Sequence, residues 1–413
     1  MGIEPMSYIE AKKRYAKIGV DTDKAIRELG KIPISLNTWQ LDDIGGWEHP
    51  VETAAGAYPG RPRTPDEMFA DLDLALKLLP GRHRINVHSL QSIQSGGKRV
   101  DRDRLTVAEF RPWIDFAKKH KVGFDFNPSC FMHPKAGGGT LADVDAANRR
   151  FWVRHCIASL KIAEQIAKEL KNPVSWTLWI DAGKHDEASD RIGPRRRFKE
   201  SLDEILRQSK VDRKLVKICL ESQLWCPAME SYAVGSHEFM SNYAAKNGLY
   251  CLLDMAHFHP TESVADKMSA MLLFSDMVAL HVARPVRFSR PHISRFDDML
   301  RDVAREVVAN GPEKFLVALD FCDSTMNRVA GLVQGTRNVQ LALLEALLLP
   351  RRELTRLQDA RRFTEEFVLT ESMKTYPLGE VYDEFCRREG VPDGADWLKD
   401  VQAFEKNVQS KRV

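Results

Sequence analysis

The chain has 413 residues, of which 43% are hydrophobic, and its 61 basic and 58 acidic side chains leave a formal net charge of +3. This near balance excludes nucleic-acid or anionic-membrane binding through net charge, and no run of about 18 apolar residues predicts a membrane-spanning helix. A charged N-terminus without an apolar signal core, and seven cysteines without a CxxC pair, predict reduced thiols and a cytoplasmic protein.

Short, nearly continuous apolar runs recur along the chain and predict strands that are buried on both faces. In chain order these runs are IPISLN (32–37), RINVHS (84–89), VGFDFN (122–127), VSWTLWI (174–180), LVKICLE (215–221), LYCLLD (249–254), MVALHVA (277–283) and FLVALDF (315–321). Strands of this kind are typical of parallel sheets whose two faces are both covered.

Helical patterns separate the runs. Thr64 and Thr106 begin two helices with N-cap signals, and further helices are predicted over 144–170, 195–208, 231–246, 261–272, 295–310 and 325–348. Strand–helix alternation repeated eight times predicts an α/β fold, a (β/α)8 TIM barrel over residues 31–348. A doubly wound open sheet is the alternative, but no GxGxxG follows the first run.

Two extensions flank the predicted barrel. Residues 1–30 contain one predicted helix, over about 7–29, and residues 349–413 form a C-terminal extension with two or three helices. These C-terminal helices cannot join a ring that is already complete, so we expect them to cover its side or to contact another subunit. The charged tail QSKRV is expected to be frayed.

Four consecutive predicted strands carry a metal-binding side chain at or near their C-terminal ends, where barrel active sites form. These residues are Glu221, Asp254, His281 and Asp320. Three carboxylates and one imidazole suit Mn²⁺, Mg²⁺ or Co²⁺ better than structural Zn²⁺. Helix caps or salt-bridge partners are the alternative, but four such residues on adjacent strands favour one strongly bound ion. His257 lies three residues after Asp254 and could hold a second ion bridged by Glu221.

The motifs around these residues resemble the L-rhamnose isomerase family over nearly the whole chain. They are WQLDDIGGWEHP (39–50), FDFNPSCFMHP (124–134), ESYAVGSHEF (230–239), LLDMAHFHPTE (252–262), LHVARPVRF (280–288) and LDFCDSTMNRVAGLVQGTRN (319–338). The resemblance implies a barrel with added helices, a homo-tetramer, and Mn²⁺-dependent conversion of the small sugar L-rhamnose to L-rhamnulose. It assigns the first metal to Glu221, Asp254, His281 and Asp320, and the histidine of a second, catalytic metal to His257.

Other residues at the strand ends are candidates for contact with the sugar. In sugar isomerases of this architecture, a histidine placed like His88 helps ring opening or binds a ring oxygen; a hydrogen-bonded strand-end histidine is the alternative. Trp39, Phe131 and Trp179 follow the first, third and fourth strands. Aromatic rings there can stack on sugar faces, although aromatic residues in such places also belong to the core.

The sequence departs from the family at three positions of one functional unit. In the family, two aspartates after the seventh strand complete the second metal site, and here those positions are Ser289 and Pro291. A lysine near the substrate carbonyl is replaced by Gln223, an amide that can hydrogen-bond but brings no charge. We therefore expect a weak second site, and slow or absent L-rhamnose turnover unless these groups are restored.

Several functions remain open at this point. The first hypothesis is a metal-dependent aldose–ketose isomerase for L-rhamnose or a related sugar. The second is a single-metal sugar epimerase or a lyase/dehydratase that abstracts a proton beside a carbonyl, with Glu221 or His257 as the base. The third is a catalytically impaired homologue whose metal only holds the mouth of the barrel together.

Overall fold

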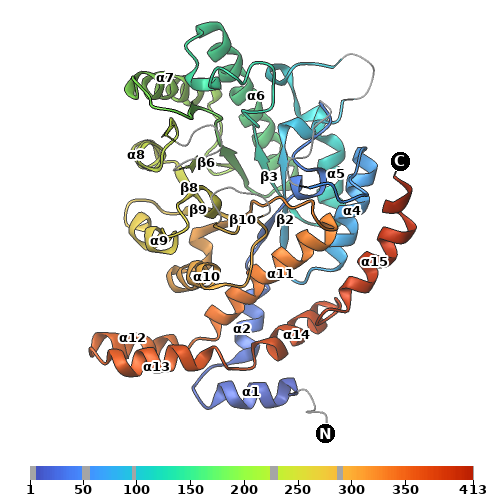
Figure 1. The fold of residues 1–413 in the computed structure, drawn as a ribbon, viewed down its shortest axis with the longest axis vertical. Helices are drawn as coiled ribbons and strands as arrows, with labels where there is room; N and C mark the ends of the chain where they lie inside the picture. Colours follow the sequence, from blue (N-terminus) through green and yellow to red (C-terminus); the bar gives the residue numbers. More distant parts are fainter. Residues whose placement is uncertain (1–5, 49–55, 95–98, 224–230, 286–291, 413) are drawn as a thin grey trace.

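The computed structural model describes residues 6–48, 56–94, 99–223, 231–285 and 292–412. Its centre is a closed barrel of parallel strands surrounded by helices (Figure 1). The strands are β1 (Ile34–Asn37), β2 (His83–His88), β3 (Gly123–Asn127), β4 (Val174–Leu178), β6 (Val216–Ser222), β8 (Tyr250–Asp254), β9 (Val278–Val282) and β10 (Phe315–Leu319). Successive strands pair in this order, and β10 closes on β1, which confirms the predicted (β/α)8 fold.

The strands form where the sequence predicts them because both of their faces are covered. One face packs inside the barrel and the other against the helices, so almost every residue of these eight strands is buried. Most of the apolar ones belong to one large cluster, and Cys219, Leu252 and Ala279 form a second, small one. The surrounding helices are α3 (Trp39–Asp42), α4 (Pro65–Lys77), α5 (Arg111–His120), α6 (Ala146–Leu170), α7 (Ile192–Ser209), α8 (His237–Asn247), α9 (Ala265–Leu272), α10 (Asp298–Asn310) and α11 (Arg328–Leu347). Among the described residues, no helix has both the length and the apolarity needed to cross a membrane.

Two short segments outside the barrel differ from the predicted pattern. β5 (Gly183–Lys184) and β7 (Tyr232–Ala233) form a small antiparallel sheet beside the barrel mouth. The helix predicted over 231–246 therefore begins only at His237, because the preceding residues are extended and Gly235 accepts a hydrogen bond from the backbone of Gln223.

The N-terminal extension contains two helices where the sequence pattern predicts one. They are α1 (Tyr8–Ala16) and α2 (Thr22–Leu29). Gly19 has a φ of +75° and so turns the chain between them, and the Asp21 side chain caps the second helix by accepting from the amide of Lys24. Apolar periodicity continues across this break, which is why it does not reveal the turn.

The C-terminal extension has four helices, one more than the upper limit of the prediction. They are α12 (Arg351–Asp359), α13 (Phe363–Met373), α14 (Leu378–Glu389) and α15 (Trp397–Asn407). In Figure 1 the pair α12 and α13 extends away from the barrel, whereas α14 and α15 run along its side. The expectation of a frayed tail is wrong for the described residues, because the 3-10 turn η7 (Gln409–Lys411) is followed by Arg412, which forms a buried ion pair with Asp71 of α4.

Candidate metal centre

The residues singled out at the ends of the last four strands lie together at the C-terminal mouth of the barrel. Glu221 and His281 are the penultimate residues of β6 and β9, Asp254 ends β8, and Asp320 directly follows β10. Asp254 and His281 are register partners on neighbouring strands. One ligand atom from each residue lies within 4.8 Å of all the others, so a single ion can contact all four.

The His281 ring lies among the carboxylates of this cluster. Its Nδ1 is 3.1 Å from Asp320 Oδ2, 3.4 Å from Glu221 Oε2 and 3.6 Å from Asp254 Oδ2. None of these contacts has hydrogen-bond geometry, and Asp254 Oδ2 and both His281 ring nitrogens are buried without a hydrogen bond. Buried polar atoms are rarely left this way, and three carboxylates with one imidazole form the ligand set of a divalent cation. The residues therefore fit such an ion.

Burial and charge shift the pKa values of these groups in different directions. Burial raises the pKa of Asp254 to about 6. Burial alone would lower the pKa of His281, but the surrounding carboxylates raise it well above its usual range. Burial alone would raise the pKa of Asp320, but the neighbouring His281 ring, 3.1 Å away, lowers it. A divalent cation has to displace any proton held by this set before it binds.

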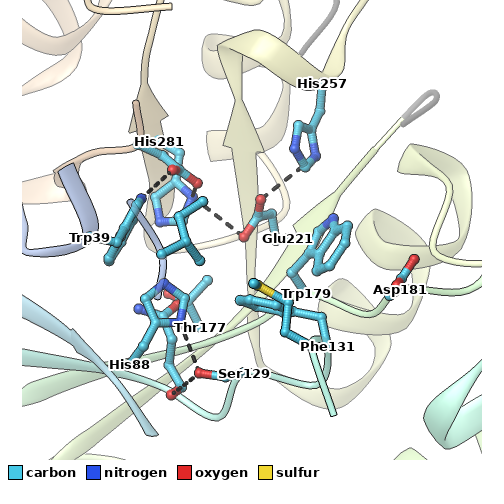
Figure 2. A pocket seen from close by; sticks show the side chains of 14 residues that line it. Trp39, His88, Ser129, Phe131, Thr177, Trp179, Asp181, Glu221, His257 and His281 are labelled. Carbon is cyan, nitrogen blue, oxygen red and sulfur yellow. Dashed lines mark hydrogen bonds and ion pairs between the residues drawn. The ribbon is translucent and has the colours of Figure 1, made fainter. Parts of the chain in front are cut away.

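His257 lies beside the cluster, on the far side of Glu221. Its Nδ1 is 3.6 Å from Glu221 Oε1, and its Nε2 is 4.0 Å from Asp254 Oδ2. Figure 2 shows the Glu221 carboxylate between the His257 and His281 rings, with one oxygen toward each. Ser289 and Pro291, the altered positions of the second site, lie outside the described residues.

A cavity of about 240 Å³ opens above the cluster, slightly below the usual range of ligand cavities. It is lined by Trp39, Ile44, His88, Asn127, Ser129, Phe131, Met132, Thr177, Trp179, Asp181, Glu221, His257, His281 and Asp320. In Figure 2, Trp39 and Trp179 lie beside the metal-binding side chains, and Phe131 and His88 lie further from them. A space of this size and lining suits one monosaccharide.

The predicted aromatic residues form a connected wall. His88 meets Trp39 edge-on with ring centroids 4.3 Å apart and Phe131 at 5.5 Å, and Phe131 meets Trp179 at 5.4 Å. The Trp39 indole also donates to Asp320 Oδ1 at 2.9 Å, which joins the wall to the cluster. Edge-to-face contacts of this kind fix the ring orientations relative to one another.

His88 is held in a defined orientation. Its Nδ1 lies 2.9 Å from the Ser129 hydroxyl, and burial lowers the pKa of the ring to about 3. The imidazole is therefore neutral near pH 7 and offers one donor and one acceptor nitrogen.

Gln223 does not join the described lining of the cavity. Gln223 follows β6 and forms an isolated parallel bridge with Ser236. The side-chain oxygen of Gln223 accepts a 2.7 Å hydrogen bond from the Trp179 indole, so the amide lies against the wall.

The sequence alone does not predict several of the residues that line the cavity. Asn127 ends β3, and the same search for polar strand ends could have identified it. Thr177 lies inside β4, and Ser129 and Met132 lie in the loop after β3, where no periodic signal predicts which side chains face the cavity. Asp181 lies on the rim, and burial raises its pKa.

A family model and curated relatives both match this chain over nearly its full length. A family model for L-rhamnose isomerase (RhaA) matches residues 3–412. The chain is 41% identical over 420 residues to the L-rhamnose isomerase of Mannheimia succiniciproducens, with 100% of each chain covered. It is 39% identical over 410 residues to the L-rhamnose isomerase of Escherichia coli, with 97% of each covered. A solved structure of L-ribulose 3-epimerase gives a TM-score of 0.48 at 13% identity, covering 78% of this chain and 97% of that one, a likeness too weak to bear on function.

Proposed function

The chain belongs to the L-rhamnose isomerase family, and we propose that it is a metal-dependent aldose–ketose isomerase acting on L-rhamnose or a related sugar. The observation that carries this proposal is the cluster of Glu221, Asp254, His281 and Asp320 beneath a cavity of monosaccharide size. Three carboxylates and one imidazole would hold a divalent ion, with Mn²⁺, Mg²⁺ and Co²⁺ as the candidates and one strongly bound ion expected.

Aldose–ketose isomerisation moves one hydrogen from C2 to C1 and one proton from the C2 hydroxyl to the C1 oxygen. A bound divalent ion polarises the carbonyl and hydroxyl oxygens of the sugar. Glu221 and His257, with 3.6 Å between Oε1 and Nδ1, form the pair that can take and return the hydroxyl proton.

The remaining residues bind and orient the sugar. Trp39, Phe131 and Trp179 cover its apolar face and exclude water from the cavity. Neutral His88 donates or accepts one hydrogen bond at a sugar oxygen, and Gln223 acts through Trp179 by fixing its indole. In this proposal Gln223 is a positioning residue.

A single-metal epimerase or lyase is the second candidate. The observation that favours it is the sequence itself, because Ser289 and Pro291 cannot supply the two carboxylates that the family resemblance assigns to a second ion. Such an enzyme would remove a proton beside a carbonyl, with Glu221 or His257 as the base.

An assay of L-rhamnulose formation with excess Mn²⁺ in D2O tests the proposal. Transfer of hydrogen within the sugar leaves its C–H bonds free of deuterium, whereas proton abstraction introduces deuterium from solvent. Asp254→Asn should abolish turnover and lower Mn²⁺ affinity more than about 100-fold by calorimetry. Asp323→Asn is the matched control, because Asp323 is also buried after β10 but accepts hydrogen bonds from Thr325.

Formation of L-rhamnulose without deuterium uptake supports the isomerase, and deuterium uptake at one carbon without L-rhamnulose formation supports the epimerase or lyase. Wild-type inactivity toward L-rhamnose, together with a silent Gln223→Lys, Ser289→Asp, Pro291→Asp triple variant that folds and binds the first ion, would contradict L-rhamnose as the substrate.

We also propose a cytoplasmic homo-tetramer. The compartment is supported by the six described cysteines, which are buried and form no disulfide, as expected in reducing surroundings. The tetramer rests on the family resemblance and is testable by light scattering.

A further inference from the structure

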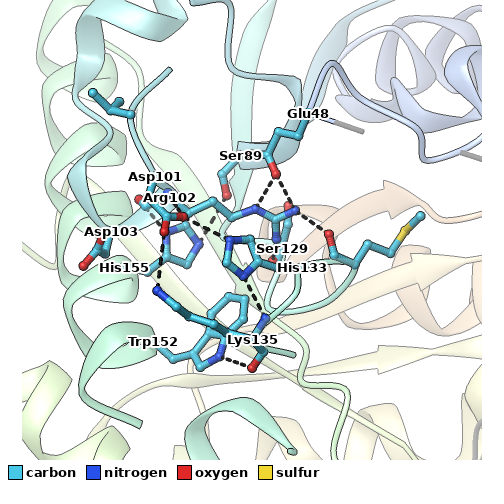
Figure 3. Close-up of polar contacts among 12 residues, drawn as sticks. Glu48, Ser89, Asp101, Arg102, Asp103, Ser129, His133, Lys135, Trp152 and His155 are labelled. Atoms are coloured by element: carbon cyan, nitrogen blue, oxygen red, sulfur yellow. Dashed lines mark hydrogen bonds and ion pairs between the residues drawn. The ribbon is translucent and has the colours of Figure 1, made fainter. Parts of the chain in front are cut away.

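Arg102 is a buried cation on the aromatic side of the barrel mouth. It begins the 3-10 turn η2 (Arg102–Arg104) after β2, and its side chain is only 2% exposed. Figure 3 shows its guanidinium between Glu48, which follows β1, and the loop that follows β3. One side chain thus connects three loops that come from three neighbouring strands.

All five N–H donors of the guanidinium take part in these contacts. Its Nε donates to Glu48 Oε2 at 2.8 Å, and its Nη1 donates to the carbonyl oxygens of Ser129 and Phe131 at 2.5 and 2.7 Å. Its Nη2 donates to the carbonyl of Met132 at 3.0 Å and lies 2.8 Å from Glu48. A planar fork with five N–H donors can satisfy this arrangement, and an ammonium with three donors cannot.

The loop that receives these bonds has an unfavourable backbone. Ser129 and Met132 have φ values of +57° and +48°, in the left-handed region that residues with side chains rarely adopt. The three carbonyl oxygens converge on one buried point, where their dipoles repel and they require donors. The cation supplies those donors.

The same loop forms part of the sugar cavity. The Ser129 hydroxyl contacts His88 Nδ1, and the Phe131 ring lies between His88 and Trp179 in the aromatic wall. A shift of this loop would therefore move the His88 partner and the middle ring of the wall together. The metal-binding strands β6, β8, β9 and β10 lie on the other side of the barrel.

We propose that Arg102 is a positioning residue that fixes the 129–132 loop as the wall of the sugar site. The sugar-binding part rests on the proposed function, whereas the holding of the loop does not. Arg102→Met should increase hydrogen exchange in peptides covering 128–133, measured by mass spectrometry without sugar. It should raise KM for L-rhamnose about tenfold with kcat within about twofold, because the wall contacts substrate and transition state alike. Mn²⁺ affinity should be unchanged.

Arg154→Met is the matched control. Arg154 pairs with Asp103 of the same turn at 2.7 Å, its side chain is 57% exposed, and its ion pair lies outside the 129–132 loop. It should leave both exchange and KM unchanged. Arg102→Lys keeps the charge with fewer donors, should give intermediate effects, and replaces Arg102→Met if that variant does not fold.

Hydrogen exchange, KM and Mn²⁺ affinity together decide whether the proposal holds. Unchanged exchange in both Arg102 variants overturns the proposal, and so does increased exchange with unchanged KM. A parallel loss of Mn²⁺ affinity would show general collapse of the mouth and also overturns it. If wild type does not turn over L-rhamnose, the proposed function fails, while the exchange measurement still decides whether Arg102 holds the loop.

Discussion

The pKa values of two histidines in this cavity shift in opposite directions because their neighbours differ. The His281 ring faces three carboxylates, which raise its pKa well above the usual range despite burial. The His88 ring faces Trp39, Phe131 and the Ser129 hydroxyl, so burial dominates and lowers its pKa to about 3. His281 therefore lies in the charged part of the site, and His88 lies in its uncharged part.

This difference predicts how a His88 variant responds to pH. A histidine pKa of about 3 keeps the ring neutral above about pH 4, and a bound cation nearby would lower that pKa further. His88→Asn should therefore lower kcat/KM for L-rhamnose isomerisation by about 10- to 100-fold, and by the same factor near pH 6 and near pH 8. Parallel pH–rate profiles of the two proteins measure this.

The control for that experiment is His120→Asn, because His120 contacts Asp73 away from the cavity and should leave the profile unchanged. A wild-type acidic limb that disappears in His88→Asn would show that His88 titrates in the working range, contrary to its neutral assignment.

At the scale of elements, the barrel strands follow their predicted runs closely, whereas helix breaks do not follow periodicity. The turn between α1 and α2 depends on one residue, since Gly19 has a φ of +75° and a Cβ added there would meet nothing within 4 Å. The cost of a side chain at this position is therefore one of backbone conformation alone.

Gly19→Ala should destabilise the protein by about 1 kcal/mol, because an L-residue in the left-handed region is disfavoured by that order. Urea unfolding followed by circular dichroism measures the change. Gly379→Ala is the matched control in the first turn of α14, where a Cβ also meets nothing within 4 Å and φ is not positive. It should be neutral or slightly stabilising, and equal losses in both variants would contradict the backbone argument.

At the scale of the whole molecule, the C-terminal segment closes back onto the barrel. Arg412 makes two parallel hydrogen bonds with Asp71 of α4, at 2.7 and 2.8 Å, and also donates to the carbonyl of Gly60. The Asp71 side chain is fully buried and that of Arg412 is 3% exposed, so neither charge has solvent as an alternative partner. Contacts between residues so far apart in the chain tie α15 and η7 to the barrel wall.

Arg412→Met should therefore cost about 3–5 kcal/mol of unfolding free energy, because it leaves a buried carboxylate without its cation. The double variant Arg412→Met, Asp71→Asn should be less destabilised than the single variant, since no charge remains buried. Thermal and urea unfolding of the three proteins measure this.

Lys399→Met is the control, because the Lys399–Asp396 pair is exposed and should contribute nothing measurable. If the double variant were at least as unstable as Arg412→Met, the cost would lie in lost packing and not in the buried charge.

Much of the fold and part of the site can be predicted from the sequence, for a local reason. Continuous apolar runs predict strands covered on both faces, and a polar residue at the end of each run predicts what faces the barrel mouth. Glu221, Asp254, His281 and Asp320 come together because each lies at or next to the C-terminal end of its own strand, and the barrel aligns those strand ends.

Tertiary structure alone decided the features that depend on residues distant in the chain. The orientation of Gln223 depends on the Trp179 indole, the pKa of His88 on its burial, and the 129–132 loop on Arg102. The Arg412–Asp71 ion pair is decided in the same way. Hydrophobic periodicity reports which face of an element is buried, whereas these features depend on which atoms meet after burial, and no local pattern encodes that.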